Sequence, residues 1–173
     1  VHGDELNPIA AVQETFATLD PAKMSGTAIA IIGPSRQGVE NITRTWTIND
    51  LGGEQVNPNR TWPGREDGNT VERHCWLITN KLIKGNVDIG IDHHTGGTGV
   101  DFARFVFAYA DDPASVELGG LCPVDQLMLD PGFPGTLPTD PMALQQGFSA
   151  GLVLNGNRGT TGVVVDNPST FYN

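Results

Sequence analysis

Two short clusters of side chains have the types and spacing that a metal ion requires. In the first, His2 and Glu5 place an imidazole and a carboxylate three residues apart, and zinc accepts this pair of ligand types readily. The second, residues 92–95, reads Asp-His-His-Thr and directly follows an apolar stretch. Side chains alternate along a strand, so Asp92 and His94 would lie on the same side of it. His94 could then complete a metal site with His2 and Glu5 that keeps a fourth position for water, as in hydrolytic zinc sites.

Each of these residues also has a plain structural interpretation. A His-x-x-Glu string arises often by chance, so His2 and Glu5 could belong to a solvated turn. His94 could be a histidine whose hydrogen bonds are satisfied in the core or at the surface. In the metal interpretation, Asp92 would accept a hydrogen bond from a ligand imidazole rather than reach the ion itself. We expect His74 to be structural, because it lies near the core face of an expected helix.

A third cluster, residues 57–64, has the side chains that recognise a carboxylate. Arg60 presents a planar guanidinium that matches a carboxylate, and the amide of the neighbouring Asn59 can add a further hydrogen bond. The Trp-Pro-Gly string at residues 62–64 is expected to hold this loop in a fixed turn. The alternative interpretation is an ordinary arginine on a surface loop.

Secondary-structure elements must bring these clusters together. Apolar residues at helical spacing predict helices over 9–19 and 71–82. The stretch between residues 35 and 69 is polar and rich in turn formers, and a loop of that length is more often functional than idle. Short apolar runs predict strands, and one further helix is expected. The strands cover residues 27–32, 87–92, 105–110, 126–129, 151–154 and 162–165, and the helix lies near 141–146.

Strands that alternate with helices imply an α/β domain built around a largely parallel sheet. Functional sites in such sheets gather in loops beyond the carboxyl ends of the strands, and the polar clusters lie at those places. We find no internal repeat and no linker in the sequence. Residues 1–173 are therefore expected to form a single domain.

Composition excludes several classes of partner. The chain carries 10 Lys and Arg against 20 Asp and Glu, a net charge of −10. Such a surface repels phosphate backbones and anionic lipid, so we expect neither a nucleic-acid nor a membrane partner. The longest apolar runs are far too short to span a bilayer. The two cysteines, Cys75 and Cys122, form no disulfide framework or zinc motif and leave the cellular compartment open.

In order and wording, the three clusters resemble the succinylglutamate desuccinylase/aspartoacylase family of the zinc carboxypeptidase superfamily. That family has a strand ending in Gly-x-His-Gly-(Asp/Asn)-Glu, a loop with Asn-Arg-x-(Phe/Trp)-Pro-Gly and a strand ending in Asp-x-His-Thr. This chain has the matching strings at residues 2–5, 59–64 and 92–95, and residues 124–137 also resemble a later segment of bacterial members. The first matching strand would end at Val1, so we expect the chain to be a fragment that lacks earlier strands of the family.

The resemblance implies a fold, a cofactor and a substrate class. The implied fold is a three-layer α/β domain, with a mostly parallel mixed sheet flanked by helices. Zinc would be held by His2, Glu5 and His94. Asn59 and Arg60 would bind the carboxylate of a small N-acyl amino acid or peptide-like substrate, whose amide bond is hydrolysed.

The catalytic glutamate of the family has no clear counterpart in this chain. Family members carry it late, on a strand resembling Ala-x-Thr-x-Glu-x-Gly, and the matching stretch here places Leu154 or Asn155 at the Glu position. Glu117 lies in a string that imitates the motif, but it is also the kind of carboxylate expected in the first turn of a helix. Asp166 is a weaker candidate. We therefore name Glu117 as the candidate base, with a first-turn surface carboxylate as the alternative.

A second arginine of the family, which polarises the scissile carbonyl, is also hard to place. Arg44 is the nearest upstream candidate, but sequence spacing alone does not support this role. Two functions follow from these observations: a zinc-dependent deacylase, or a zinc- or ligand-binding homologue that lacks the general base and does not turn over. A structural α/β module without a metal is the third interpretation.

Overall fold

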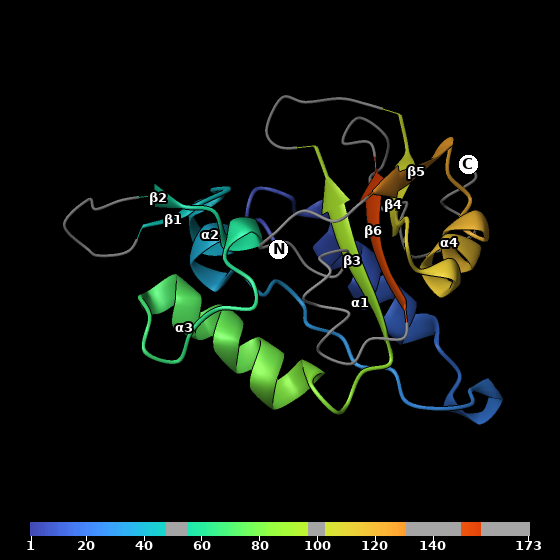
Figure 1. Cartoon of the computed structure of the whole chain (residues 1–173), viewed down its shortest axis with the longest axis horizontal. Helices are drawn as coiled ribbons and strands as arrows, with labels where there is room; N and C mark the ends of the chain where they lie inside the picture. The colour runs from blue at the N-terminus through green and yellow to red at the C-terminus, as the bar shows by residue number, and fades with distance from the viewer. Residues whose placement is uncertain (48–54, 97–102, 131–149, 157–173) are drawn as a thin grey trace.

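A four-stranded sheet carries the candidate site in the computed structural model, which describes residues 1–47, 55–96, 103–130 and 150–156. The strand order is β3-β6-β4-β5 (Figure 1). β3 pairs with β6 in parallel, β4 pairs with β5 in parallel, and β4 and β6 are antiparallel. The strands are β3 (Ile89–Thr95), β4 (Phe105–Tyr109), β5 (Gln126–Asp130) and β6 (Ala150–Gly156). The expected helix near 141–146 and strand at 162–165 lie outside the described residues.

Helix α1 (Asn7–Thr18) begins directly after the first cluster and contacts β3. Pro8 stands in its first turn, where the missing backbone N–H costs no hydrogen bond. Asp20 ends the segment by capping the short turn η1 (Pro21–Lys23) through the backbone N–H of Ala22. The helix predicted over 9–19 is therefore confirmed. It sets the direction in which the chain leaves the turn that carries His2 and Glu5.

The strand expected at residues 27–32 is not formed. The segment has no strand partner among the described residues, and its large side chains are partly in solvent: Ile29 is 45% exposed, Ile31 38% and Ile32 47%. Apolar β-branched composition favours a strand only where a neighbouring edge supplies hydrogen-bond partners. This prediction was therefore wrong for the structure described.

Helix α3 (Thr70–Leu77) starts at Asn69 with a capping box and continues into the wider π-helical turn η3 (Ile78–Ile83). The prediction over 71–82 is confirmed in position, and Ile78 packs against the core cluster as expected, but Ile78 and Leu82 are only partly buried. The buried positions are spaced by four, at Val71, Cys75, Thr79 and Ile83. A π-turn contains more residues per turn than an α-helix, so the most buried side chains there are Thr79 and Ile83 instead of Ile78 and Leu82.

Short elements fill the long segment between α1 and α3. They are α2 (Arg36–Asn41), the antiparallel pair β1 (Trp46–Thr47) and β2 (Gln55–Val56), and the 3-10 turn η2 (Pro58–Arg60). Trp46 and Trp62 pack with the buried face of α3 into one core cluster. This cluster forms a rigid base for the loop that carries Asn59 and Arg60.

A second core lies between helix α4 (Pro113–Gly120) and the strands that it contacts. The helix is capped by Asp112 and packs against β4, β5 and β6 (Figure 1). Val106 and Ala108 of β4 are fully buried there against apolar residues of α4 and the segment after it. No helix in the described part of the chain is long and apolar enough to cross a membrane.

Candidate metal centre

His2, Glu5 and His94 meet in one buried cluster. His2 and Glu5 lie in the turn before α1, and His94 lies near the carboxyl end of β3. The three residues are 3%, 3% and 4% exposed, and one ligand atom from each lies within 4.8 Å of the others. The structure therefore joins two segments that are 89 residues apart in sequence.

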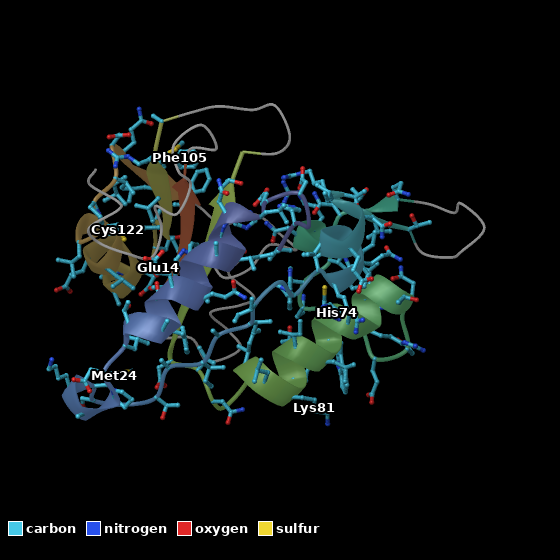
Figure 2. The ribbon with its side chains drawn as sticks, turned by 180° about the vertical axis from the view of Figure 1, so that it is seen from behind. Glu14, Met24, His74, Lys81, Phe105 and Cys122 are labelled. Carbon is cyan, nitrogen blue, oxygen red and sulfur yellow. The ribbon has the colours of Figure 1, made fainter. Side chains whose placement is uncertain are left out.

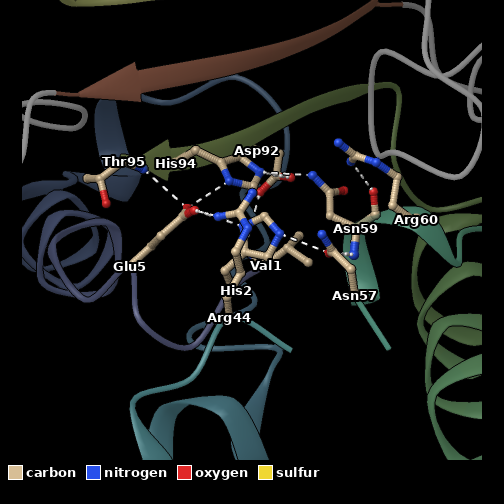
Figure 3. A network of polar contacts seen from close by, with 10 residues as sticks. All are labelled: Val1, His2, Glu5, Arg44, Asn57, Asn59, Arg60, Asp92, His94 and Thr95. Carbon is tan, nitrogen blue, oxygen red and sulfur yellow. Dashed lines mark hydrogen bonds and ion pairs between the residues drawn. The ribbon is translucent and has the colours of Figure 1, made fainter. Parts of the chain in front are cut away.

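Glu5 is the centre of this cluster (Figure 3). Its Oε1 lies 2.8 Å from Nδ1 of His2 and accepts a hydrogen bond from Nη1 of Arg44 at 2.7 Å. Its Oε2 lies 2.7 Å from Nδ1 of His94 and accepts the backbone N–H of Thr95 at 3.2 Å. Both imidazoles thus direct the same ring nitrogen at one carboxylate.

The outer ring nitrogen of each histidine contacts a further side chain. Nε2 of His94 lies 2.7 Å from Oδ2 of Asp92, two residues earlier on β3. Nε2 of His2 lies 3.0 Å from Oδ1 of Asn57. The contact expected between Asp92 and His94 is therefore present. An outer acceptor of this kind leaves the inner nitrogen available to an ion.

Charge in the cluster favours a bound cation. Burial alone would raise the pKa of Glu5, but hydrogen bonds with His2 and His94 outweigh it and hold this pKa well below its usual range. Burial lowers the pKa of His2. Burial would also lower the pKa of His94, but Asp92 and Glu5 raise it to about 9. Two carboxylates thus favour positive charge at one buried point, whether it comes from a proton or from a metal ion.

A backbone contact between two glycines sets the position of the first cluster. A Cβ on Gly3 would lie 1.8 Å from the carbonyl carbon of Gly38 in α2, so only glycine allows this approach. The N–H of Gly3 donates to the carbonyl of Thr43 at 3.1 Å. This contact brings the next residue, Arg44, to Glu5. The spacing of residues in the sequence does not predict that Arg44 contacts Glu5, because this contact depends on the packing of α2 against the turn that carries Gly3.

Asn59 and Arg60 lie beside the cluster on η2. Asn59 is buried, with Nδ2 3.5 Å from Nε2 of His94. Arg60 is exposed, and its Nη1 donates to the carbonyl of Asn59 at 2.6 Å. The following turn is held rigidly, since Gly64 has φ +82° and a Cβ there would lie 2.2 Å from the carbonyl oxygen of Glu72. The structure therefore brings Asn59 to His94, whereas Arg60 lies next to it in the turn and contacts Asn59 rather than a candidate ligand.

Glu117 is not brought to the cluster. It is an exposed residue of α4, which packs against β4, β5 and β6, and it takes part in none of the hydrogen bonds around Glu5. It also lies beyond the first turn of α4, which starts at Pro113. In Figure 1, α4 lies on the β4 and β5 side of the sheet, away from the N-terminal turn that carries His2 and Glu5.

Strand β6 lies directly beside β3 and places two residues next to the histidines. In the parallel register, Asn155 is the partner of His94, and Leu154 is the partner of His93. These are the two positions that the resemblance led us to expect at the place of the family's catalytic glutamate. Neither residue carries a carboxylate, and β6 contains none.

The structure also separates His74 from the candidate site. His74 is on α3, and its ring packs against Trp46 with the ring centroids 4.8 Å apart. Figure 2 shows it on the side of the molecule formed by α3, away from the sheet. The structural role expected for this histidine agrees with that placement.

The fold and the cluster define an α/β protein with a buried His-Glu-His group, of a kind that could hold a metal ion, beside the end of a strand. The chain belongs to the succinylglutamate desuccinylase/aspartoacylase family, because residues 1–124 match the catalytic domain of that family. No curated protein sequence matches the chain.

Solved structures of this family share the fold of the chain. A succinylglutamate desuccinylase from Silicibacter sp. TM1040 is 21% identical, with a TM-score of 0.71 over 93% of this chain and 50% of its own length. The product-bound ectoine utilization protein EutE (DoeB) from Ruegeria pomeroyi is 22% identical, with a TM-score of 0.70, over 93% and 50%. An aspartoacylase family protein from Mesorhizobium loti is 25% identical, with a TM-score of 0.71, over 93% and 51%. The chain thus spans about half the length of these proteins.

Proposed function

We propose that this chain is the zinc-binding part of a deacylase that hydrolyses the amide bond of an N-acyl amino acid or a peptide-like substrate. The observation that carries the proposal is the buried cluster of His2, Glu5 and His94, in which two imidazole nitrogens face one carboxylate. Two nitrogen ligands and one oxygen ligand with a position left open are the donor set of hydrolytic zinc sites. Family membership supports the deacylase class.

Each residue near the cluster has a distinct task in this proposal. A bound zinc ion supplies a Lewis acid and a nucleophilic water. Asp92 and Asn57 orient the ligand imidazoles through their outer nitrogens. Asn59 and Arg60 orient the substrate carboxylate, which positions the amide for attack. We assign the polarisation of the substrate carbonyl to Arg44, because its Nη1 lies beside the proposed ligands, 2.7 Å from Glu5.

The proposal extends to the architecture and the partners. We place the cluster in a single catalytic domain covering residues 1–173, with the three-layer, mostly parallel sheet of zinc carboxypeptidases. The partner is a small molecule rather than a nucleic acid or a membrane. The net charge of −10 supports this choice, and the arginines beside the cluster give a local positive charge that suits a carboxylate.

Zinc content and hydrolysis test the proposal together. After dialysis against a weak chelator, native mass spectrometry of the purified chain should show about one zinc ion per chain. The zinc-loaded chain is then assayed for amine release from a panel of N-acetyl and N-succinyl amino acids. A chain that takes up no zinc, under conditions in which its circular dichroism shows it folded, would refute the metal centre.

A second function, metal or ligand binding without turnover, is favoured by one observation. The register of β6 places Asn155 next to His94, and an amide cannot take the proton that hydrolysis transfers from water to the leaving amine. The variant Asn155→Glu separates the two functions. If the chain is a binding protein, zinc loads normally, the unchanged chain is inactive, and the variant gains turnover. Turnover by the unchanged chain would exclude this second function.

A further inference from the structure

We infer that Gln37 is a positioning residue that orients Arg44 at the candidate metal centre. The inference rests on the proposed function for the task of Arg44, but the contacts that carry it involve no metal. Gln37 lies on α2, and its side-chain amide contacts Thr47, three residues after Arg44. We call residues 43–47 the Arg44 segment. Gln37 thus acts on Arg44 through the backbone of this segment and not through the reacting atoms.

The amide of Gln37 pairs with both main-chain groups of Thr47, at the end of the Arg44 segment. Its Oε1 accepts the N–H of Thr47 at 3.0 Å, and its Nε2 donates to the carbonyl of the same residue at 3.5 Å. Because a backbone N–H can only donate, the amide oxygen is the atom that faces it. Gln37 therefore gives β1 the pair of hydrogen bonds that a neighbouring antiparallel strand would give.

Main-chain contacts hold the start of the Arg44 segment. The N–H of Thr43 donates to the carbonyl of Gly38 at 2.9 Å, and the carbonyl of Thr43 accepts the N–H of Gly3 at 3.1 Å. Gly38 directly follows Gln37 on α2. Two consecutive residues of one helix thus anchor both ends of the segment, and Arg44 lies between these anchors.

Two further contacts fix the middle of the Arg44 segment. Nε1 of Trp46 donates to Oγ of Ser35, which is the N-cap of α2. Oγ1 of Thr43 donates to the carbonyl of Thr45 at 3.0 Å. The side chain of Arg44 itself is 44% exposed, and an exposed arginine loses rotamer freedom when it is ordered. A fixed backbone limits the positions open to the guanidinium and so favours its contact with Glu5.

The orientation of Arg44 matters because one guanidinium serves two partners in the proposed function. Its Nη1 donates to Oε1 of Glu5 at 2.7 Å (Figure 3), and a guanidinium has further N–H donors for a substrate carbonyl. A misplacement of about 1 Å in such a group can lower a rate by about 100-fold. Loss of the Gln37 amide should therefore reach the reaction through Arg44.

Two substitutions separate the hydrogen bonds of Gln37 from its bulk. Gln37→Met has a similar length but no donor and only a weak acceptor, so it should release the end of the Arg44 segment. Gln37→Glu keeps an oxygen for the shorter contact with Thr47 and should be affected less. Asn41→Ala is the matched control, because Asn41 is also an amide of α2, but its Nδ2 donates to the carbonyl of Gln37 within the helix.

The first readout is 15N–1H NMR of the arginine guanidinium groups in the full chain, which needs neither zinc nor turnover. The signal of Arg44 is assigned by its loss in Arg44→Lys. It should exchange slowly in the unchanged chain, in Gln37→Glu and in Asn41→Ala, because its donor is bonded to a carboxylate. It should broaden in Gln37→Met. An unchanged Arg44 signal in Gln37→Met that circular dichroism shows folded, or no slow signal in the unchanged chain, would overturn the inference.

The second readout is the split between kcat and KM in the zinc-loaded chain. Gln37→Met should lower kcat by up to about 100-fold and leave KM nearly unchanged, because Asn59 and Arg60 lie on η2. A loss confined to KM, or an equal loss of kcat in Asn41→Ala, would overturn the inference. A chain that shows no turnover, while Gln37→Met still broadens the Arg44 signal, would refute the proposed function and leave the role of Gln37 standing.

Discussion

Glu5 does more than supply one ligand, since it holds both histidines in place before any ion binds. Each of its oxygens contacts one imidazole and one further donor, so all three candidate ligands are oriented through a single carboxylate. Burying an ionised carboxylate is costly unless it is paired and hydrogen-bonded. Glu5 meets that requirement with partners from three parts of the chain: the N-terminal turn, Arg44 and the end of β3. The free energy needed to order and bury these side chains is thus supplied during folding. An ion would find the proposed ligands close to their final positions.

Removing one imidazole should abolish tight zinc binding. His94→Ala deletes a proposed ligand and removes one partner each from the buried carboxylates of Glu5 and Asp92, so zinc content after dialysis should fall from about one per chain to near zero. His74→Ala is the control, because His74 packs on Trp46 and contacts none of the ligands. Inductively coupled plasma mass spectrometry measures both. Zinc retained equally by His94→Ala and the unchanged chain would remove His94 from the ligand set.

The elements show why the sequence predicted some of the site and not the rest. Spacing predicted that His2, Glu5 and His94 lie together, because His2 and Glu5 share one turn and strand periodicity orients His94, and the structure brings the three side chains together. Arg44 reaches Glu5 through the packing of Gly3 on Gly38, which no spacing rule contains.

The expected elements failed where tertiary contacts decide. The run at residues 27–32 has strand composition but no strand partner among the described residues. In the π-turn after α3, the buried positions are Thr79 and Ile83 rather than the expected Ile78 and Leu82. Both α1 and α3 were predictable because caps and apolar periodicity act locally.

The turn after η2 should be highly sensitive to an added methyl group. Gly64→Ala combines a positive φ with a Cβ 2.2 Å from the carbonyl oxygen of Glu72 and 2.4 Å from the backbone nitrogen of Trp76. We expect a loss of unfolding free energy of about 3 kcal/mol or more, because backbone on one side must move. Urea denaturation followed by circular dichroism measures it.

Gly85→Ala is the matched control for that change. Gly85 has φ +79°, nearly the same as Gly64, but a Cβ there would meet nothing within 4 Å. Only the intrinsic cost of the left-handed conformation applies, about 1 kcal/mol. If the two variants lose the same stability, the close approach of the turn to α3 has no energetic role.

For the molecule as a whole, a metal at this cluster would join the N-terminal turn to the sheet. A ligand that binds only the folded chain stabilises it by RT ln(1 + [L]/Kd), about 2.7 kcal/mol at a hundredfold excess over Kd. Adding zinc should therefore raise the Tm by several degrees, and EDTA should reverse the change. Differential scanning calorimetry of the chain and of His94→Ala tests this. A zinc-dependent rise in the variant equal to that of the unchanged chain would place the ion elsewhere.

The distance along the chain between Glu5 and His94 has a consequence for how the protein is made. They are 89 residues apart, and a ribosome that adds about 5–20 residues per second needs roughly 4–18 s to go from one to the other. During that interval the nascent chain offers Glu5 to solvent with half of its partners still unsynthesised. If the cluster binds zinc as proposed, the complete ligand set exists only after β3 has been made, so the ion must reach a chain that is already at least that long.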